Sequence, residues 1–282
     1  MAKPVVITAD STCDLPQELR ERYQIRIIPL TVLLGEESCP DGEGFTAEDI
    51  YARYRADGTL PKTSAPSIQQ FMDFFGSILE EGCEIVHLSI GSELSASFNN
   101  ARLASLELEG VWPVDSRMLS TGIALLCLEG AECRDRGMPA AEIAEHLQSL
   151  TEKVDTSFVL DTLEFLWKGG RCSAIAALGA NLLHLKPGLE MKDGKLCIYK
   201  KYRGGIQAVY RQYVKDRLAD REIRPGHIFV TDSGEVPEET LEELAGIVRE
   251  AVPGACVHYA KAGCTITAHC GPKTLGVLFI HQ

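Results

Sequence analysis

Short apolar runs alternate along this chain with longer amphipathic stretches, and this alternation constrains the fold more than any other feature of the sequence. Short runs predict strands, whereas apolar residues that recur with a period of about 3.6 predict helices. Strands that alternate with helices are typical of an α/β fold with a largely parallel sheet. In the first half we expect strands at residues 5–8, 25–34, 85–89 and 111–114, and helices at residues 46–56, 68–81, 95–108 and 118–136.

The pattern changes in the second half of the chain. After a helix at residues 140–150 come strands at 158–160, 185–191 and 196–202 with hairpin character, and Asp193-Gly194 marks a tight turn. Further helices are expected at 206–218 and 241–251, and strands at 227–231, 255–259 and 275–280. The sequence therefore predicts an α/β protein of two domains. The N-terminal α/β domain, residues 1–153, has a largely parallel sheet with flanking helices; the C-terminal mixed α/β domain covers residues 154–282, with a ligand cleft between the two.

Two helix starts carry a specific capping signal. Thr46 is followed three residues later by Asp49, and Ser67 by Gln70. In a capping box the first side chain binds the amide of the fourth residue, and the fourth side chain binds the amide of the first. We therefore expect helices to begin just after Thr46 and Ser67.

Charge and composition exclude several classes of protein. The chain has 282 residues and a formal net charge of -12, and its lysines and arginines form no run, so a nucleic-acid surface is not expected. No segment approaches the roughly 18 apolar residues of a membrane helix, and the N-terminus has no signal-peptide pattern, so we expect a cytoplasmic protein that does not insert into membranes.

The ten cysteines are spread without a Cys-x-x-Cys pair, which favours reduced thiols.

His269 is the residue that best indicates a function. It lies in the segment Cys264-Thr-Ile-Thr-Ala-His-Cys-Gly-Pro-Lys-Thr-Leu-Gly276. Because Gly and Pro follow it closely, we expect it on bent backbone, where it can point into a cleft and hold a proton or an anion. Cys264, His269 and Cys270 offer three zinc ligands, but no tight Cys/His pair elsewhere offers a fourth. We therefore expect neither a metal nor another cofactor.

Three further segments are rich in hydroxyl groups or cations, namely Thr63-Ser-Ala-Pro-Ser67, Ser92-Glu-Leu-Ser-Ala-Ser97 and Lys168-Gly-Gly-Arg171. Thr63 precedes the expected helix start near residue 68, and Ser95 opens the next expected helix, so both are candidates for binding an anion at a helix N-terminus. The alternative is that Thr63 and Ser95 are ordinary capping residues and that Arg171 is a solvated side chain after a helix ended by Gly170.

Apolar strands end in Asp-Ser at three places: Asp10-Ser11, Asp115-Ser116 and Asp232-Ser233. Ligands of open α/β sheets bind outside the carboxyl ends of the strands, so these groups are candidates for lining a cleft. For Asp115 and Asp232 we favour the alternative, in which Asp and Ser cap the following helix. For Asp10 neither interpretation is favoured.

These segments, together with Asp10-Ser-Thr-Cys-Asp-Leu-Pro16, resemble the DegV family of fatty-acid-binding proteins in their order and spacing, over essentially the whole chain. The resemblance implies a non-catalytic, lipid-binding carrier of a long-chain fatty acid. It implies that Thr63, Ser95, Arg171 and His269 bind the carboxylate at the domain interface and that the acyl tail enters an apolar tunnel. Apolar runs at residues 123–128 and 175–185 are long enough to line a tunnel, but an ordinary core explains them equally well.

The resemblance also implies a partner, a separate fatty acid kinase that transfers phosphate from ATP to the bound carboxylate for phospholipid synthesis. Arg203 matches a basic position that resembles the family's kinase-docking surface; the alternative is a solvated hairpin charge. This chain has no phosphate-binding loop of its own.

Two other functions remain as alternatives. One is a hydrolase or phosphotransferase that uses Asp10, Asp14, Ser11 and His269 as acid, base and nucleophile, although the sequence has no Gly-x-Ser-x-Gly elbow. The other is a lipid-sensing regulator with no kinase partner. The resemblance is incomplete at Ala65, Leu94-Ser-Ala-Ser-Phe98 and Cys172, where the family usually has other residues, and this affects the expected acyl-chain preference.

Overall fold

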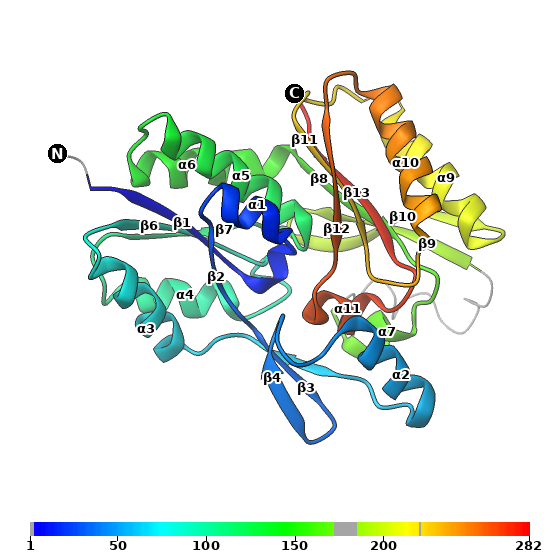
Figure 1. The fold of residues 1–282 in the computed structure, drawn as a ribbon, viewed down its shortest axis with the longest axis horizontal. Coiled ribbons are helices and arrows are strands. Elements are labelled where there is room, and N and C mark those ends of the chain that lie inside the picture. Colours follow the sequence, from blue (N-terminus) through cyan, green and yellow to red (C-terminus); the bar gives the residue numbers. More distant parts are fainter. Residues whose placement is uncertain (1–2, 172–184, 220) are drawn as a thin grey trace.

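The computed structural model describes residues 3–171, 185–219 and 221–282, and it places most strands in two large sheets (Figure 1). The first sheet has the order β2-β1-β6-β7, and all its neighbouring strands are parallel. Its strands are β2 (Arg26–Ile28), β1 (Val5–Asp10), β6 (Glu84–Ser89) and β7 (Val111–Asp115). The predicted parallel sheet of the N-terminal half is confirmed.

Helices cover both faces of this sheet. Figure 1 shows α5 (Thr121–Asp135) and α6 (Ala140–Leu150) on one face, and α3 (Ile68–Leu79) and α4 (Ser97–Ser105) on the other. Both predicted capping boxes are present, because Thr46 and Asp49 cap α2 (Ala47–Asp57), and Ser67 and Gln70 cap α3. A short helix, α1 (Gln17–Arg22), follows β1.

The second sheet is mixed and has the order β10-β9-β8-β13-β11-β12. β11 and β12 are parallel and the other pairs are antiparallel. The hairpin character predicted for the strands at 158–160, 185–191 and 196–202 is confirmed by the antiparallel pairs β8–β9 and β9–β10. In the β9–β10 turn, Asp193 and Gly194 have φ of 51° and 76°, the left-handed pair of a type I′ turn. The strands are β8 (Val154–Val159), β9 (Leu185–Lys192), β10 (Lys195–Arg203), β11 (His227–Asp232), β12 (Cys256–Lys261) and β13 (Leu275–Ile280).

Helix α5 lies between the two sheets. It packs against β1 and β6 of the first sheet and against β8, β11 and β13 of the second, and twelve of its fifteen residues are buried. A helix that is buried on all sides belongs to a core. The predicted apolar run 123–128 is part of this core, whereas most of the run 175–185 lies outside the described residues. On the other face of the second sheet, α9 (Ile206–Leu218) and α10 (Glu238–Ala251) cover a separate apolar cluster (Figure 1).

The strand predicted at residues 25–34 is wrong, because the structure divides it into two strands in different sheets. β2 ends at Ile28, and β3 (Thr31–Leu34) joins β4 (Glu37–Pro40) and β5 (Lys62–Ser64) in a small antiparallel sheet. Pro29 separates β2 from β3 and has no amide hydrogen to continue a ladder. The small sheet, which the sequence did not indicate, carries Thr63 opposite Val32.

The two large sheets share one apolar cluster, which contains Ile7 and Leu88 from the first sheet and Phe158 and Leu278 from the second. The first sheet uses no strand beyond Asp115, and the second begins at Val154. The domain boundary at 153/154 stays a prediction. Within the described ranges, no helix combines the length and apolar character that crossing a bilayer requires.

The close contact between α5 and β8 predicts the effect of one methyl group. A Cβ atom at Gly122 would lie 2.1 Å from Oγ1 of Thr156, a buried side chain on β8, whereas a Cβ at Gly246 in α10 would meet nothing within 4 Å. We expect Gly122→Ala to lower the free energy of unfolding by ~1–3 kcal/mol through overpacking. Gly246→Ala should leave it unchanged or raise it by up to ~1 kcal/mol. Urea denaturation of both variants measures the difference, and equal stability of the two would contradict this account of the contact.

Candidate functional site

His269 lies on the short helix α11 (Cys264–Cys270), which differs from the bent backbone that we predicted for it. The bend begins two residues later, at Gly271, whose φ is 73°. Figure 1 shows α11 at the junction of the two halves, beside α2 and α7 (Glu164–Gly169). The prediction failed because the contacts that hold α11 as a helix come from distant segments of the chain.

Two carboxylates from the N-terminal part of the chain accept hydrogen bonds at the start of α11. Asp14 Oδ1 accepts from the Gly263 amide at 2.8 Å, and Asp41 Oδ1 accepts from the Thr265 amide at 3.3 Å. A side-chain acceptor at this position satisfies an amide that has no partner within the helix. Burial raises the pKa of Asp14 well above its ordinary value, although hydrogen bonds from Ser120 and Gly263 act in the opposite direction. These bonds hold the start of α11 beside the turn that follows β1 and beside the small sheet of β3, β4 and β5.

The imidazole of His269 contacts Thr63. Its Nε2 atom lies 2.9 Å from Thr63 Oγ1, while its Nδ1 atom is buried and has no hydrogen-bond partner among the residues that the structure describes. Gly169 lies against this face of the ring, because a Cβ at Gly169 would be 2.5 Å from Nδ1. Burial lowers the pKa of His269 to about 4, and the nearby charge of Arg171 contributes. At neutral pH the ring is therefore uncharged, with one donor and one acceptor nitrogen.

The other two predicted residues lie at helix ends. Ser95 Oγ accepts from the Ser97 amide at 3.2 Å, and α4 begins at Ser97, two residues later than predicted. Gly170 ends α7 in the left-handed conformation, with φ of 69°, as predicted. Arg171 follows it, donates from Nη1 to the Gly169 carbonyl at 2.7 Å, and is exposed. Arg171 thus shows the local role of the alternative interpretation, whereas Ser95 closes a two-residue turn before the N-cap Ala96. Each side chain still has hydrogen-bonding capacity for a ligand.

All four predicted residues line one cavity of about 180 Å³, which we call the outer cavity. Its polar side chains are Thr63, Ser95, Arg171, His269 and Thr265. Within the described ranges the buried Thr265 hydroxyl has no hydrogen-bond partner. The sequence did not indicate the remaining, mostly apolar lining residues: Leu30, Ala65, Ile90, Leu94, Ala96, Leu119, Leu166, Leu196, Ile266 and Cys270. Thr265 could have been found from the sequence in one way. It precedes His269 by four residues, so on a helix the two side chains share one face. The cavity suits a ligand with one anionic end and an apolar body.

Arg203 lies outside this cavity. It ends β10 and is exposed, and the structure gives its side chain no hydrogen bond or ion pair within the described residues. Its predicted role in docking stays a prediction.

The constellation of the enzyme alternative is not assembled. The buried Asp10 carboxylate accepts from the amides of Thr12 and Ile90 at 3.2 and 3.0 Å and from Ser97 Oγ at 2.7 Å. Ser11 donates to Asp41 at 2.9 Å, and none of the hydrogen bonds among the described residues joins His269 to Asp10 or Ser11. The nucleophile and the base of that hypothesis therefore have other partners.

Asp115 and Asp232 are capping residues, as we favoured, but they cap turns and not helices. Each accepts from the amide two residues later in the chain, Arg117 at 3.0 Å and Gly234 at 2.7 Å. Neither carboxylate lines the outer cavity.

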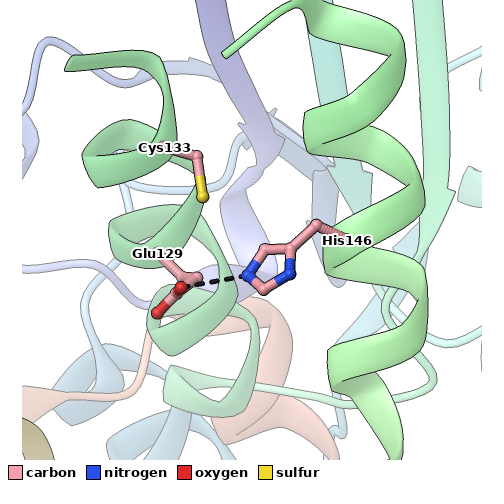
Figure 2. A group of neighbouring side chains, drawn as sticks. All are labelled: Glu129, Cys133 and His146. Atoms are coloured by element: carbon pink, nitrogen blue, oxygen red, sulfur yellow. Dashed lines mark hydrogen bonds and ion pairs between the residues drawn. The ribbon is translucent and has the colours of Figure 1, made fainter. Parts of the chain in front are cut away.

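In the part of the chain that the structure describes, one group of side chains has metal-ligand character: Glu129, Cys133 and His146 (Figure 2). This group differs from Cys264, His269 and Cys270, the three zinc ligands that the sequence offered. Cys264 donates to the Phe45 carbonyl at 3.1 Å. Glu129 pairs with His146 at 3.0 Å and with Arg224 at 2.6 Å.

Arginines account for this group without an ion. Arg136 donates to Cys133 Sγ at 3.1 Å, and Arg224 occupies the second oxygen of Glu129. A divalent cation at this position would lie beside two guanidinium charges. The group is an ion-pair network that links α5 and α6 to the segment before β11.

Comparison with known proteins gives matches over nearly the whole chain. The model of a family described as "Uncharacterised protein, DegV family" matches residues 4–282. A protein of Thermotoga maritima named "Fatty acid-binding protein" is 30% identical over 283 residues, which cover 96% of each chain. A DegV domain-containing protein of Streptomyces coelicolor is 30% identical over 287 residues, which cover 99% of each chain.

Solved structures share the fold. A DegV family protein of Thermus thermophilus, described by its fatty acid binding, has 28% identity and a TM-score of 0.89, with 99% of this chain and 100% of that chain covered. A stearic acid-binding protein of Eubacterium ventriosum has 26% identity and a TM-score of 0.84, with coverage of 100% and 98%. The two-domain α/β architecture is that of these proteins.

The buried, neutral imidazole predicts an acid-dependent loss of stability. Between pH 6.5 and about 4 the unfolded chain carries a protonated His269 and the folded chain does not, so unfolding takes up a proton and stability falls as the pH falls. The full loss from this residue is up to ~3 kcal/mol. His269→Gln, which does not titrate, should therefore lose less stability than the wild type across this window. Urea denaturation at several pH values measures the difference, and parallel pH profiles would exclude a depressed pKa.

Proposed function

Because the chain belongs to the DegV family over nearly its whole length, we propose that it binds a long-chain fatty acid in the outer cavity. The observation that carries the proposal is the division of the cavity wall into a polar end, with Thr63, Ser95, Arg171 and His269, and a largely apolar remainder. Relatives with 26–30% identity are named for fatty acid binding. A fatty acid has the same two parts, a carboxylate and a hydrocarbon chain.

The polar end has the groups that a carboxylate needs. Removing a carboxylate from water costs several kcal/mol unless hydrogen bonds and positive charge replace the hydration. The hydroxyls of Thr63 and Ser95 donate to its oxygens, and Arg171 supplies the charge. A bound carboxylate beside His269 also favours the protonated imidazole, so ligand binding raises the pKa of this residue from its low value.

The hydrocarbon chain supplies most of the affinity. At ~0.8 kcal/mol per methylene, a chain with about 15 methylenes gains on the order of 12 kcal/mol on leaving water. Association takes back an estimated 4–15 kcal/mol in lost freedom of motion. The balance allows a fatty acid to stay bound through purification.

We further propose that the protein is a cytoplasmic carrier that presents the fatty acid to a separate ATP-dependent kinase. A surface hollow shares Leu94, Arg171 and Leu196 with the outer cavity, so the carboxylate end is the accessible end of the site. The kinase would transfer the γ-phosphoryl group of ATP to a carboxylate oxygen, which gives an acyl phosphate and ADP. The carrier itself has no phosphate-binding loop for ATP.

The docking surface proposed for the kinase includes Arg203. Lys195 lines the surface hollow at one end of β10, and Arg203 ends the same strand about 26 Å away at ~3.3 Å per residue. A partner that lies along this strand would contact both the exposed arginine and the carboxylate end of the site.

The test of fatty acid binding is extraction of freshly purified protein into organic solvent, followed by mass spectrometry against a mock-purified control. We expect a stoichiometric fatty acid from the wild type. Arg171→Ala and His269→Ala should retain at least ~10-fold less, because a hydrogen bond to a charged group contributes ~1.5–3 kcal/mol. Wild-type lipid content in both folded variants would contradict the assignment of these residues.

Arg203→Ala separates docking from binding. Since Arg203 does not line the outer cavity, the variant should hold as much fatty acid as the wild type but yield less acyl phosphate when kinase and ATP are added. Equal rates of phosphorylation for variant and wild type would remove Arg203 from the docking surface. A wild-type protein that holds fatty acid but is never phosphorylated would be the lipid-sensing regulator.

A further inference from the structure

Thr265 is the polar residue of the outer cavity that the proposed function does not use. It lies on α11 with 3% of its surface exposed, and its hydroxyl has no hydrogen-bond partner within the described ranges. Its amide is satisfied, since it donates to Asp41 at 3.3 Å. Burial of a hydroxyl without a partner costs free energy, because hydrogen bonds to water are lost and not replaced. An unpaired hydroxyl in a cavity wall therefore points to a ligand that pairs with it.

Other hydroxyls of the same segment show the usual arrangement. Thr267 of α11 is also buried, but its hydroxyl donates to the Ala262 carbonyl at 3.3 Å. Thr274, just after the helix, donates to the Cys270 carbonyl at 3.0 Å. Neither threonine lines the outer cavity. In this segment a hydroxyl that serves only the fold thus has a backbone carbonyl as its acceptor, and Thr265 differs in both respects.

Thr265 lies one helical turn from the proposed head-group site. It precedes His269 by four residues on α11, so the two side chains share one face and are about 6 Å apart along the helix axis. His269 contacts Thr63 at the polar end of the cavity. A chain attached to a carboxylate at that end can therefore reach Thr265 after a few carbons. Apart from the polar end, Thr265 is the only polar residue among the described residues that line this cavity.

The hydroxyl can be presented to the cavity by rotation about one bond. The Thr265 Oγ1 atom is itself enclosed, but the hydroxyl and the methyl group of threonine have nearly the same size. Rotation about χ1 exchanges them, and threonine in helices occupies two χ1 rotamers. A ligand oxygen at this wall gives the hydroxyl the partner that it lacks and selects the rotamer that presents it. A plain hydrocarbon chain leaves the hydroxyl unpaired.

We propose that Thr265 forms a second polar subsite, which binds a hydroxyl group carried by the acyl chain. The proposal rests on the proposed function and names its substrate class, a fatty acid hydroxylated a few carbons from the carboxylate. The carboxylate occupies the polar end of the cavity, and the chain hydroxyl pairs with Thr265 one helical turn away. A hydroxyl both donates and accepts, so it pairs with Thr265 in either direction. The subsite recognises an oxygen atom on the chain, and this recognition is independent of chain length.

The first test is the affinity of purified, delipidated protein for eighteen-carbon fatty acids that carry one hydroxyl at successive positions, with the unsubstituted acid as reference. At the position that reaches Thr265, we expect binding at least as tight as that of the reference. At the other buried positions the hydroxyl has no partner, so the affinity should fall about tenfold. The same affinity at every position, or an equal loss at every position, would overturn the proposal. If neither the reference nor any hydroxylated acid binds, the proposed function itself fails, and the subsite with it.

Thr265→Val tests whether the hydroxyl is responsible, because it replaces the hydroxyl by a methyl group and keeps the shape of the side chain. The variant should bind the favoured hydroxylated acid about tenfold more weakly than the wild type does, and the unsubstituted acid at least as tightly. Thr265→Ser retains a hydroxyl and should retain the preference. Thr267→Val is the matched control, since it removes a buried hydroxyl from the same helix outside the cavity. A preference that survives in Thr265→Val, or that is lost equally in Thr267→Val, contradicts the assignment.

A second measurement needs no ligand. In the delipidated protein, Thr265→Val removes an unpaired hydroxyl and should raise the midpoint of urea denaturation, whereas Thr267→Val removes a paired one and should lower it. A lower midpoint for Thr265→Val would show that the hydroxyl already has a partner in the free protein, and the subsite would then be wrong. Because no fatty acid takes part in this measurement, its result does not depend on the proposed function.

Discussion

The hydrogen bonds between two buried carboxylates and the start of α11 are the interaction on which the site depends. Asp14 and Asp41 come from the N-terminal part of the chain, and α11 belongs to its last twenty residues. These bonds set the position of α11, and α11 in turn places His269 beside Thr63 and supplies Thr265, Ile266 and Cys270 to the outer cavity. The polar end of this cavity and part of its apolar wall therefore have one structural origin.

Local sequence signals predicted those parts of the fold that local interactions determine. The capping boxes at Thr46 and Ser67 were correct because their partners lie three residues away. The turn at Asp193-Gly194 and the parallel order of the first sheet followed from residue type and from the spacing of apolar runs. The four candidate site residues came from a resemblance to a family, and the structure brings all four to one cavity.

The failed predictions have a different physical cause. The helix that carries His269 depends on a contact between Gly263 and Asp14, which are 249 residues apart. The division of residues 25–34 between two sheets depends on the pairing of Val32 with Thr63. The apolar residues that line the outer cavity are ordinary core side chains in the sequence, and only the tertiary structure shows that they face a cavity. Neither hydrophobic periodicity nor a short motif indicates contacts between residues that lie so far apart in the sequence.

The burial of α5 has a consequence for how a ligand reaches the site. When a proposed ligand site lies at the junction of two domains, a hinge motion that moves the domains apart is the usual expectation for ligand entry. Here α5 packs against both large sheets and twelve of its residues are buried, so a swing of one sheet away from the other would expose core apolar surface to water. The proposed exchange of a fatty acid is then expected to use small movements at the rim, near Arg171 and the surface hollow, while α5 keeps the two sheets in contact.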